Sequence, residues 1–147
     1  MDQAKTISEV ALDGHHLTLE DFVAVARYGA PVRLTDEAVA AIRRSRDLAE
    51  KIMREDRVAY GITTGFGDFA NVAVPEEMSS QLSTNLILSH CVGTGEPYSE
   101  EEVRGMMLLR ANALCAGVSG VRPVLVQRLA ELLNRHVTPW KIGRAHV

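Results

Sequence analysis

The fold is indicated most clearly by residues 99–123, which read SEEEVRGMMLLRANALCAGVSGVRP. Ser99 and Glu102 have the spacing of a capping box, which satisfies backbone N–H groups at the start of a helix. Apolar residues follow at helical spacing as far as the glycines of the GVSG sequence. Pro123 then opens a second helix, whose apolar residues are Val126, Leu129, Leu132 and Leu133. Two neighbouring helices with a short Gly/Pro joint predict a helical hairpin in a bundle.

A further helix is expected upstream, over residues 75–90. Leu82, Leu86 and His90 are four residues apart, so we expect His90 to continue the apolar face of this helix. Ser89 lies beside it on an adjoining polar stripe. A histidine on an apolar face is more often a hydrogen-bonded core residue than a functional one, and both interpretations stay open at this point.

The first 75 residues predict a small α+β region. Short strands are expected over residues 7–12 and 32–34, because turn-forming residues bound them. Thr18 has the position of an N-cap for a helix that ends near Gly29, and residues 35–37 open a longer helix with its arginines mostly on the solvent side. The predicted fold class is therefore mainly α, with a few short strands before long bundle helices.

A glycine-rich segment, VAYGITTGFG, occupies residues 58–67. Its glycines, Gly61, Gly65 and Gly67, permit positive φ angles and close approach of the backbone to another group. The segment lacks both the lysine of a phosphate-binding loop and the GxGxxG spacing of a dinucleotide site. Two interpretations stay open, a plain connection and a ligand-facing loop that carries Tyr60.

The composition argues against several classes of protein. The chain has 147 residues and a net charge of −3, so it lacks the basic footprint of a nucleic-acid-binding protein. No apolar run approaches the roughly 20 residues that span a membrane, and we expect a cytoplasmic protein without a secretory signal. Cys91 and Cys115 lie in apolar segments without metal-ligand spacing. We therefore expect buried free thiols and no metal site.

Three motifs occur in order along the chain. They are YGITTGFG at residues 60–67, NLILSHCVGTG at 85–95 and LLRANALCAGVSGVRP at 108–123. Together they resemble the histidine/phenylalanine/tyrosine ammonia-lyase family, and the resemblance runs from about Val10 to Pro139. It implies a mainly helical homotetramer that removes ammonia from an amino acid and leaves an α,β-unsaturated acid. It also implies no bound cofactor, because the family forms a methylidene-imidazolone electrophile from an Ala-Ser-Gly triad of its own chain.

The resemblance assigns roles to the candidate residues. Tyr60 matches the family's loop tyrosine, an acid/base group over the substrate, although a phenol with a pKa near 10 needs help from neighbouring groups to act as a base. The hinges of that loop would be Gly61, Gly65 and Gly67. His90 and Ser89 resemble the Ser-His pair of histidine ammonia-lyases, in which the imidazole would bind the substrate's ring. The favoured reaction is therefore L-histidine to urocanate and ammonia; phenylalanine or tyrosine deamination, or 2,3-aminomutase chemistry, is the alternative.

The C-terminal residues depart from the family pattern. In the family the chain continues after Pro139 to the Ala-Ser-Gly triad, a sequence that does not occur in these 147 residues. We interpret residues 141–147, KIGRAHV, as a non-native tail, because all but the first match one translated frame of a common sequencing adapter. A divergent short protein is the alternative. Residues 1–75 would then be the N-terminal region with the Tyr60 loop, and residues 76–140 the first, incomplete part of the central bundle.

This interpretation has consequences for the isolated chain. We expect it to be inactive and poorly soluble, because Met106, Leu129 and Leu133 would lie partly exposed on uncovered bundle faces. A hypothesis of another class is a non-catalytic helical interaction module, which would be soluble and cooperatively folded.

Overall fold

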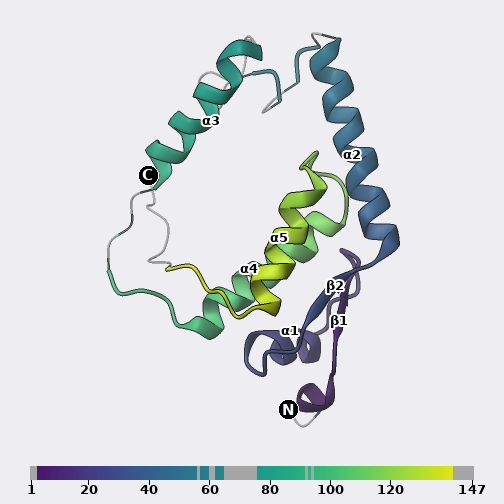
Figure 1. The fold of residues 1–147 in the computed structure, drawn as a ribbon, viewed down its shortest axis with the longest axis vertical. Coiled ribbons are helices and arrows are strands. Elements are labelled where there is room, and N and C mark those ends of the chain that lie inside the picture. The colour runs from purple at the N-terminus through teal and green to yellow at the C-terminus, as the bar shows by residue number, and fades with distance from the viewer. Residues whose placement is uncertain are drawn as a thin grey trace. The chain divides into compact units, whose positions relative to one another are not determined.

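The computed structural model describes residues 3–55, 57–59, 62–64, 76–91, 93 and 95–140, without the side chains of residues 76–79. The chain divides into two compact units, residues 1–46 with 97–141 and residues 47–96 with 142–147. The elements in order are η1 (Gln3–Thr6), β1 (Val10–Leu12), α1 (Leu19–Ala26), β2 (Val32–Leu34), α2 (Asp36–Arg54), α3 (Glu76–His90), α4 (Glu100–Cys115) and α5 (Pro123–Asn134), as labelled in Figure 1. The mainly helical fold class is confirmed.

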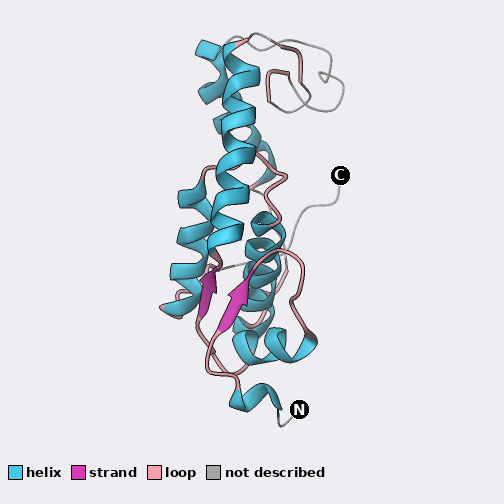
Figure 2. Ribbon diagram, turned by 90° about the vertical axis from the view of Figure 1, so that its right-hand side faces the viewer, coloured by secondary structure: helices cyan, strands magenta, loops and turns pink. Residues whose placement is uncertain are grey.

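The first unit contains a small parallel β-α-β arrangement. Val10 pairs with Val32, and Leu12 with Leu34, so β1 and β2 run in the same direction, as the two magenta arrows of Figure 2 show. Parallel neighbours need a crossover, and α1 supplies it. The strand expected at residues 32–34 is confirmed, whereas the one expected at residues 7–12 is shorter and comprises Val10–Leu12 only.

Local capping signals place the starts of two helices. Thr18 and Asp21 form a capping box at α1, and Ser99 and Glu102 form one at α4. In α4 the Ser99 backbone N–H donates to the Glu102 carboxylate over 2.8 Å. The hydrogen bonds from the Ser99 hydroxyl and the Ser99 backbone lower the pKa of Glu102. Both helices begin where the sequence predicts, because these contacts involve only residues three apart.

The core of the first unit forms where α4 packs against α1 and α5. Its largest fully buried side chains include Leu12, Val25, Ile42, Leu108, Val126 and Leu133. α4 and α5 form the predicted helical hairpin, and the joint between them lies on α2. There the Gly120 N–H donates to Ser45 Oγ over 2.9 Å, and Gly117 adopts a φ of +69° against Ala41.

The prediction of exposed apolar residues on α4 and α5 is correct only in part. The prediction is wrong for Leu133, because this residue is 1% exposed and lies in the core. Met106 and Leu129 are half-buried, whereas Leu109 and Leu125 are exposed on the outer surface of the hairpin. The prediction therefore holds for Met106 and Leu129, and the hairpin also exposes Leu109 and Leu125, which the sequence pattern does not indicate.

The buried side chain of Arg104, in α4, donates hydrogen bonds to the backbones of α1 and α5. Arg104 is 3% exposed, and its Nε and Nη2 donate to the Val25 carbonyl over 3.2 and 2.9 Å, while Nη1 donates to the Leu133 carbonyl over 3.0 Å. Both carbonyls belong to the last turn of their helices, where the helix dipole favours a cation. Burial lowers the pKa of Arg104, and the charge of Glu100 opposes that shift.

The second unit contains α3, which begins at Glu76 and ends at His90, as the sequence predicts. The prediction that His90 continues a packed apolar face is wrong: His90 is exposed, and Leu82 and Leu86 are only half-buried. Ile87 and Leu88 are 67% and 63% exposed. None of residues 80–90 is buried, so the apolar residues of α3 have no core around them among the described residues.

Candidate functional site

The residues that the sequence singles out fall into two groups. Tyr60, Gly61, Gly65 and Gly67 lie outside the described residues, so their predicted roles stay predictions. Ser89 and His90 are described, at the C-terminal end of α3, where both side chains are exposed. The structure brings these two side chains together.

Ser89 and His90 share one backbone carbonyl. Ser89 Oγ donates to the Leu86 carbonyl over 2.9 Å. His90 Nδ1 lies 2.9 Å from the same carbonyl and 2.8 Å from Ser89 Oγ. The last turn of the helix therefore holds the ring at Nδ1, and the His90 side chain is exposed.

The two cysteines differ from each other. Cys115 is buried as predicted, and burial, with a contribution from the charge of Asp13, raises the pKa of its thiol to about 11. It is therefore protonated near neutrality and is not a nucleophile. Cys91 is exposed, so the prediction of two buried thiols is wrong for it. Cys91 follows directly after α3, the helix whose apolar residues have no core around them among the described residues.

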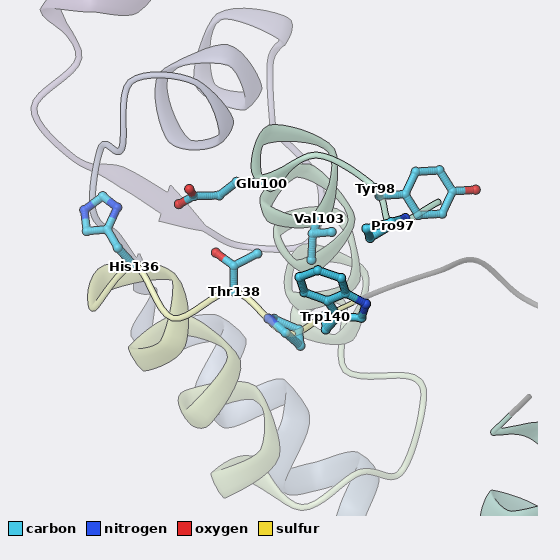
Figure 3. A pocket seen from close by; sticks show the side chains of 8 residues that line it. Pro97, Tyr98, Glu100, Val103, His136, Thr138 and Trp140 are labelled. Atoms are coloured by element: carbon cyan, nitrogen blue, oxygen red, sulfur yellow. The ribbon is translucent and has the colours of Figure 1, made fainter. Parts of the chain in front are cut away.

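The first unit holds a pocket that the sequence does not predict (Figure 3). Its volume is about 310 Å³, and its lining residues are Pro97, Tyr98, Glu100, Val103, His136, Thr138, Pro139 and Trp140. Figure 3 shows Glu100 and His136 on one side of Thr138, with Tyr98 and Trp140 on the other. Thr138 Oγ1 is buried and has no hydrogen-bond partner within the described part of the chain.

Neither the pocket nor Arg104 could be identified from spacing alone. The pocket combines residues around the start of α4 with residues that follow α5, and these are more than 30 positions apart. Arg104 and Arg110 both lie in α4, six residues apart, but Arg104 is buried and Arg110 is exposed.

The sequence predicts neither a metal site nor a membrane-spanning helix, and the structure bears on both for the described residues only. Among the described residues, no three His, Cys, Asp or Glu side chains are grouped so that they could hold a metal ion. None of the described helices is both long enough and apolar enough to cross a membrane.

Comparison with known proteins identifies a family match over most of the chain. The model of the aromatic amino acid lyase family matches residues 17–144. The histidine ammonia-lyase of Streptococcus sanguinis is 49% identical over 131 residues, which are 89% of this chain and 26% of that protein. The histidine ammonia-lyase of Gloeobacter violaceus is 49% identical over 130 residues, which are 88% and 25%. The chain thus spans about a quarter of the length of the curated relatives it matches.

Solved structures of the same kind match the fold. The tyrosine aminomutase of Streptomyces globisporus superposes with a TM-score of 0.84 at 37% identity and covers 89% of this chain and 25% of that one. The histidine ammonia-lyase of Trypanosoma cruzi superposes with a TM-score of 0.77 at 38% identity and covers 86% and 24%. The resemblance drawn from the three motifs is therefore confirmed.

Proposed function

Because the chain belongs to the aromatic amino acid lyase family, we propose that it is the N-terminal part of a histidine ammonia-lyase. Such an enzyme converts L-histidine to urocanate and ammonia. The observation that carries this choice of substrate is the Ser89–His90 pair, whose imidazole is exposed at the end of α3 and held at Nδ1. The names of the curated relatives support the same substrate.

The reaction requires that two bonds break and one forms. A base removes a proton from the β-carbon, the α-carbon releases ammonia, and the electron pair left at the β-carbon becomes the double bond. We propose Tyr60 as an acid/base group for these proton transfers and His90 as the group that binds the substrate's ring. The glycines at 61, 65 and 67 would let the loop of Tyr60 close over the substrate.

The electrophile of the family does not fit the residues of this chain. No Ala-Ser-Gly sequence occurs in the 147 residues, so no step can be assigned to a methylidene-imidazolone group here. We propose that activity requires residues that the relatives carry in the other three quarters of their length. We further propose that the whole enzyme is a cytoplasmic homotetramer, as the family resemblance implies.

An alternative substrate has support of its own. The similarity to tyrosine aminomutase structures favours tyrosine as the substrate, with deamination or 2,3-aminomutation as the reaction. Phenylalanine is a third candidate, because a phenylalanine aminomutase is also among the similar structures. These alternatives use the same fold, so only an assay of the products separates them.

The test is a chimera in which residues 17–140 replace the matching segment of the Streptococcus sanguinis histidine ammonia-lyase. We expect the purified chimera to release urocanate from L-histidine. Tyr60→Phe should lower kcat by roughly 10²- to 10⁴-fold, because it removes the proposed acid/base group. The unmodified Streptococcus enzyme is the control. Formation of cinnamate, coumarate or a β-amino acid without urocanate would contradict the histidine assignment.

A further inference from the structure

We propose that Ser89 is a positioning residue that fixes the hydrogen-bond polarity of His90. It holds the neutral ring in the form that carries its proton on Nδ1, so that Nε2 accepts a hydrogen bond from the substrate. The inference rests on the proposed function only in so far as the substrate's side chain approaches His90. It extends that function to a class of substrate, namely amino acids whose side chain ends in a hydrogen-bond donor.

The first step concerns the proton on Nδ1. The Leu86 carbonyl can only accept a hydrogen bond, and His90 Nδ1 lies 2.9 Å from its oxygen. The nitrogen must therefore be the donor in this contact. A carbonyl in the last turn of a helix also favours a donor, because the helix dipole places partial negative charge there.

The second step concerns Ser89. Its hydroxyl proton is committed to the Leu86 carbonyl over 2.9 Å, so toward His90 the oxygen offers its lone pairs. His90 Nδ1 lies 2.8 Å from that oxygen. The proton on Nδ1 therefore faces two acceptors, and a ring protonated on Nε2 alone would present a lone pair to both. Ser89 and Leu86 thus select one tautomer of the neutral ring.

The third step concerns the other edge of the ring. A neutral imidazole with its proton on Nδ1 has a lone pair on Nε2 and accepts a hydrogen bond there. His90 is exposed, and within the described residues the hydrogen bonds of its ring are those at Nδ1. The N–H of a histidine ring or the O–H of a tyrosine ring would satisfy Nε2, whereas a phenylalanine ring has no donor. The geometry therefore disfavours phenylalanine.

The tautomer can be measured in the chimera by solid-state nitrogen NMR with ¹⁵N-labelled histidine. The His90 signals are those that disappear in His90→Gln. We expect protonated Nδ1 and unprotonated Nε2 at His90 above neutral pH. We expect Ser89→Ala to shift the ring toward the Nε2-protonated form, which free histidine prefers, and Ser89→Thr to retain the original form. A ring already protonated on Nε2, or one indifferent to Ser89→Ala, would overturn the proposal.

Thr84→Val is the matched control for Ser89→Ala. Thr84 lies on the same helix, and its hydroxyl likewise donates to a carbonyl one turn earlier, that of Ser80 over 3.1 Å. Among the described residues the hydrogen bonds of the His90 ring are with Ser89 and Leu86, not with Thr84. We expect this variant to leave the His90 tautomer unchanged. An equal shift in both variants would mean that loosening of α3, rather than the Ser89 hydroxyl, governs the ring, and would overturn the proposal.

The consequence for substrates is tested in the chimera. We expect Ser89→Ala to lower kcat/KM for L-histidine by about twofold to tenfold, the size of one hydrogen bond, mainly through a higher KM. The value for 3-(2-thienyl)-L-alanine, whose ring has no donor, should change less than twofold. Equal losses for both substrates would overturn the positioning role. A chimera that forms no urocanate contradicts the proposed function, while the NMR result still decides the tautomer independently.

Discussion

At the scale of single residues, Arg104 shows how the first unit satisfies the ends of its helices. Its guanidinium donates three hydrogen bonds to carbonyls in the last turns of α1 and α5. The Val25 carbonyl accepts from no backbone N–H in the described contacts, whereas the Leu133 carbonyl also accepts from the His136 N–H over 3.2 Å. A buried charge is unfavourable by itself, so Arg104 is tolerated because it satisfies two acceptors that no other side chain reaches in the described contacts.

We expect Arg104→Met to lower the free energy of unfolding by about 2–4 kcal/mol, because the Val25 carbonyl loses its donors and the Leu133 carbonyl loses one of its donors, while the volume is largely kept. The measurement is urea denaturation of the chain followed by circular dichroism. Arg110→Met, on the same helix but exposed, is the control and should change the value by less than about 0.5 kcal/mol. Similar losses in the two variants would contradict this role.

Individual residues were predictable where the neighbours along the chain decide their surroundings. Thr18 and Ser99 were identified as helix caps because their partners lie three residues away. The burial of Arg104 and the exposure of Cys91 and His90 were not predictable, since they depend on which segments pack against α4 and α3. Helical spacing predicts the side of the helix on which a residue lies, but not which segment packs against that side.

At the scale of elements, the joint of the α4–α5 hairpin depends on a close approach to α2. Gly117 has a φ of +69°, and a Cβ built on it would lie 2.6 Å from the carbonyl carbon of Ala41. Glycine is therefore required for two reasons, the left-handed backbone and the adjacent main chain. The same joint is held by the hydrogen bond from the Gly120 N–H to Ser45 Oγ.

We expect Gly117→Ala to lower the free energy of unfolding by about 2–4 kcal/mol, the sum of backbone strain and overpacking. Gly29→Ala separates the two contributions, because Gly29 lies in the same unit and has a similar φ, +73°, but its added Cβ would meet the ring of the exposed His136 side chain and not main chain. It should be less destabilising than Gly117→Ala in the same urea denaturation. If Gly29→Ala is the more harmful of the two, the close approach to Ala41 is not the reason for glycine at position 117.

At the scale of the whole molecule, the sequence predicts the hairpin and the order of the elements but not the state of α3. The helix was predicted with one apolar face, yet Leu86, Ile87 and Leu88 are consecutive and so point in different directions. Residues 78–89 also contain no charged residue. A helix that is apolar or uncharged on all sides is typical of the centre of a bundle. Among the described residues none of positions 80–90 is buried, so the single-face prediction is wrong for this helix.

Hydrogen exchange of the purified chain tests whether this helix depends on the rest of the family's chain. An isolated 15-residue helix is marginal in water, so we expect the amides of α3 to exchange fast and those of α4 around the buried Leu108 to exchange slowly. We also expect no ammonia release from L-histidine, since no Ala-Ser-Gly is present. Addition of the remaining three quarters of the Streptococcus sanguinis enzyme should slow exchange in α3 while leaving α4 nearly unchanged. Slow exchange in α3 of the chain alone, with cooperative unfolding of both units, would instead favour the non-catalytic interaction module, and ammonia release would contradict the requirement for the missing residues.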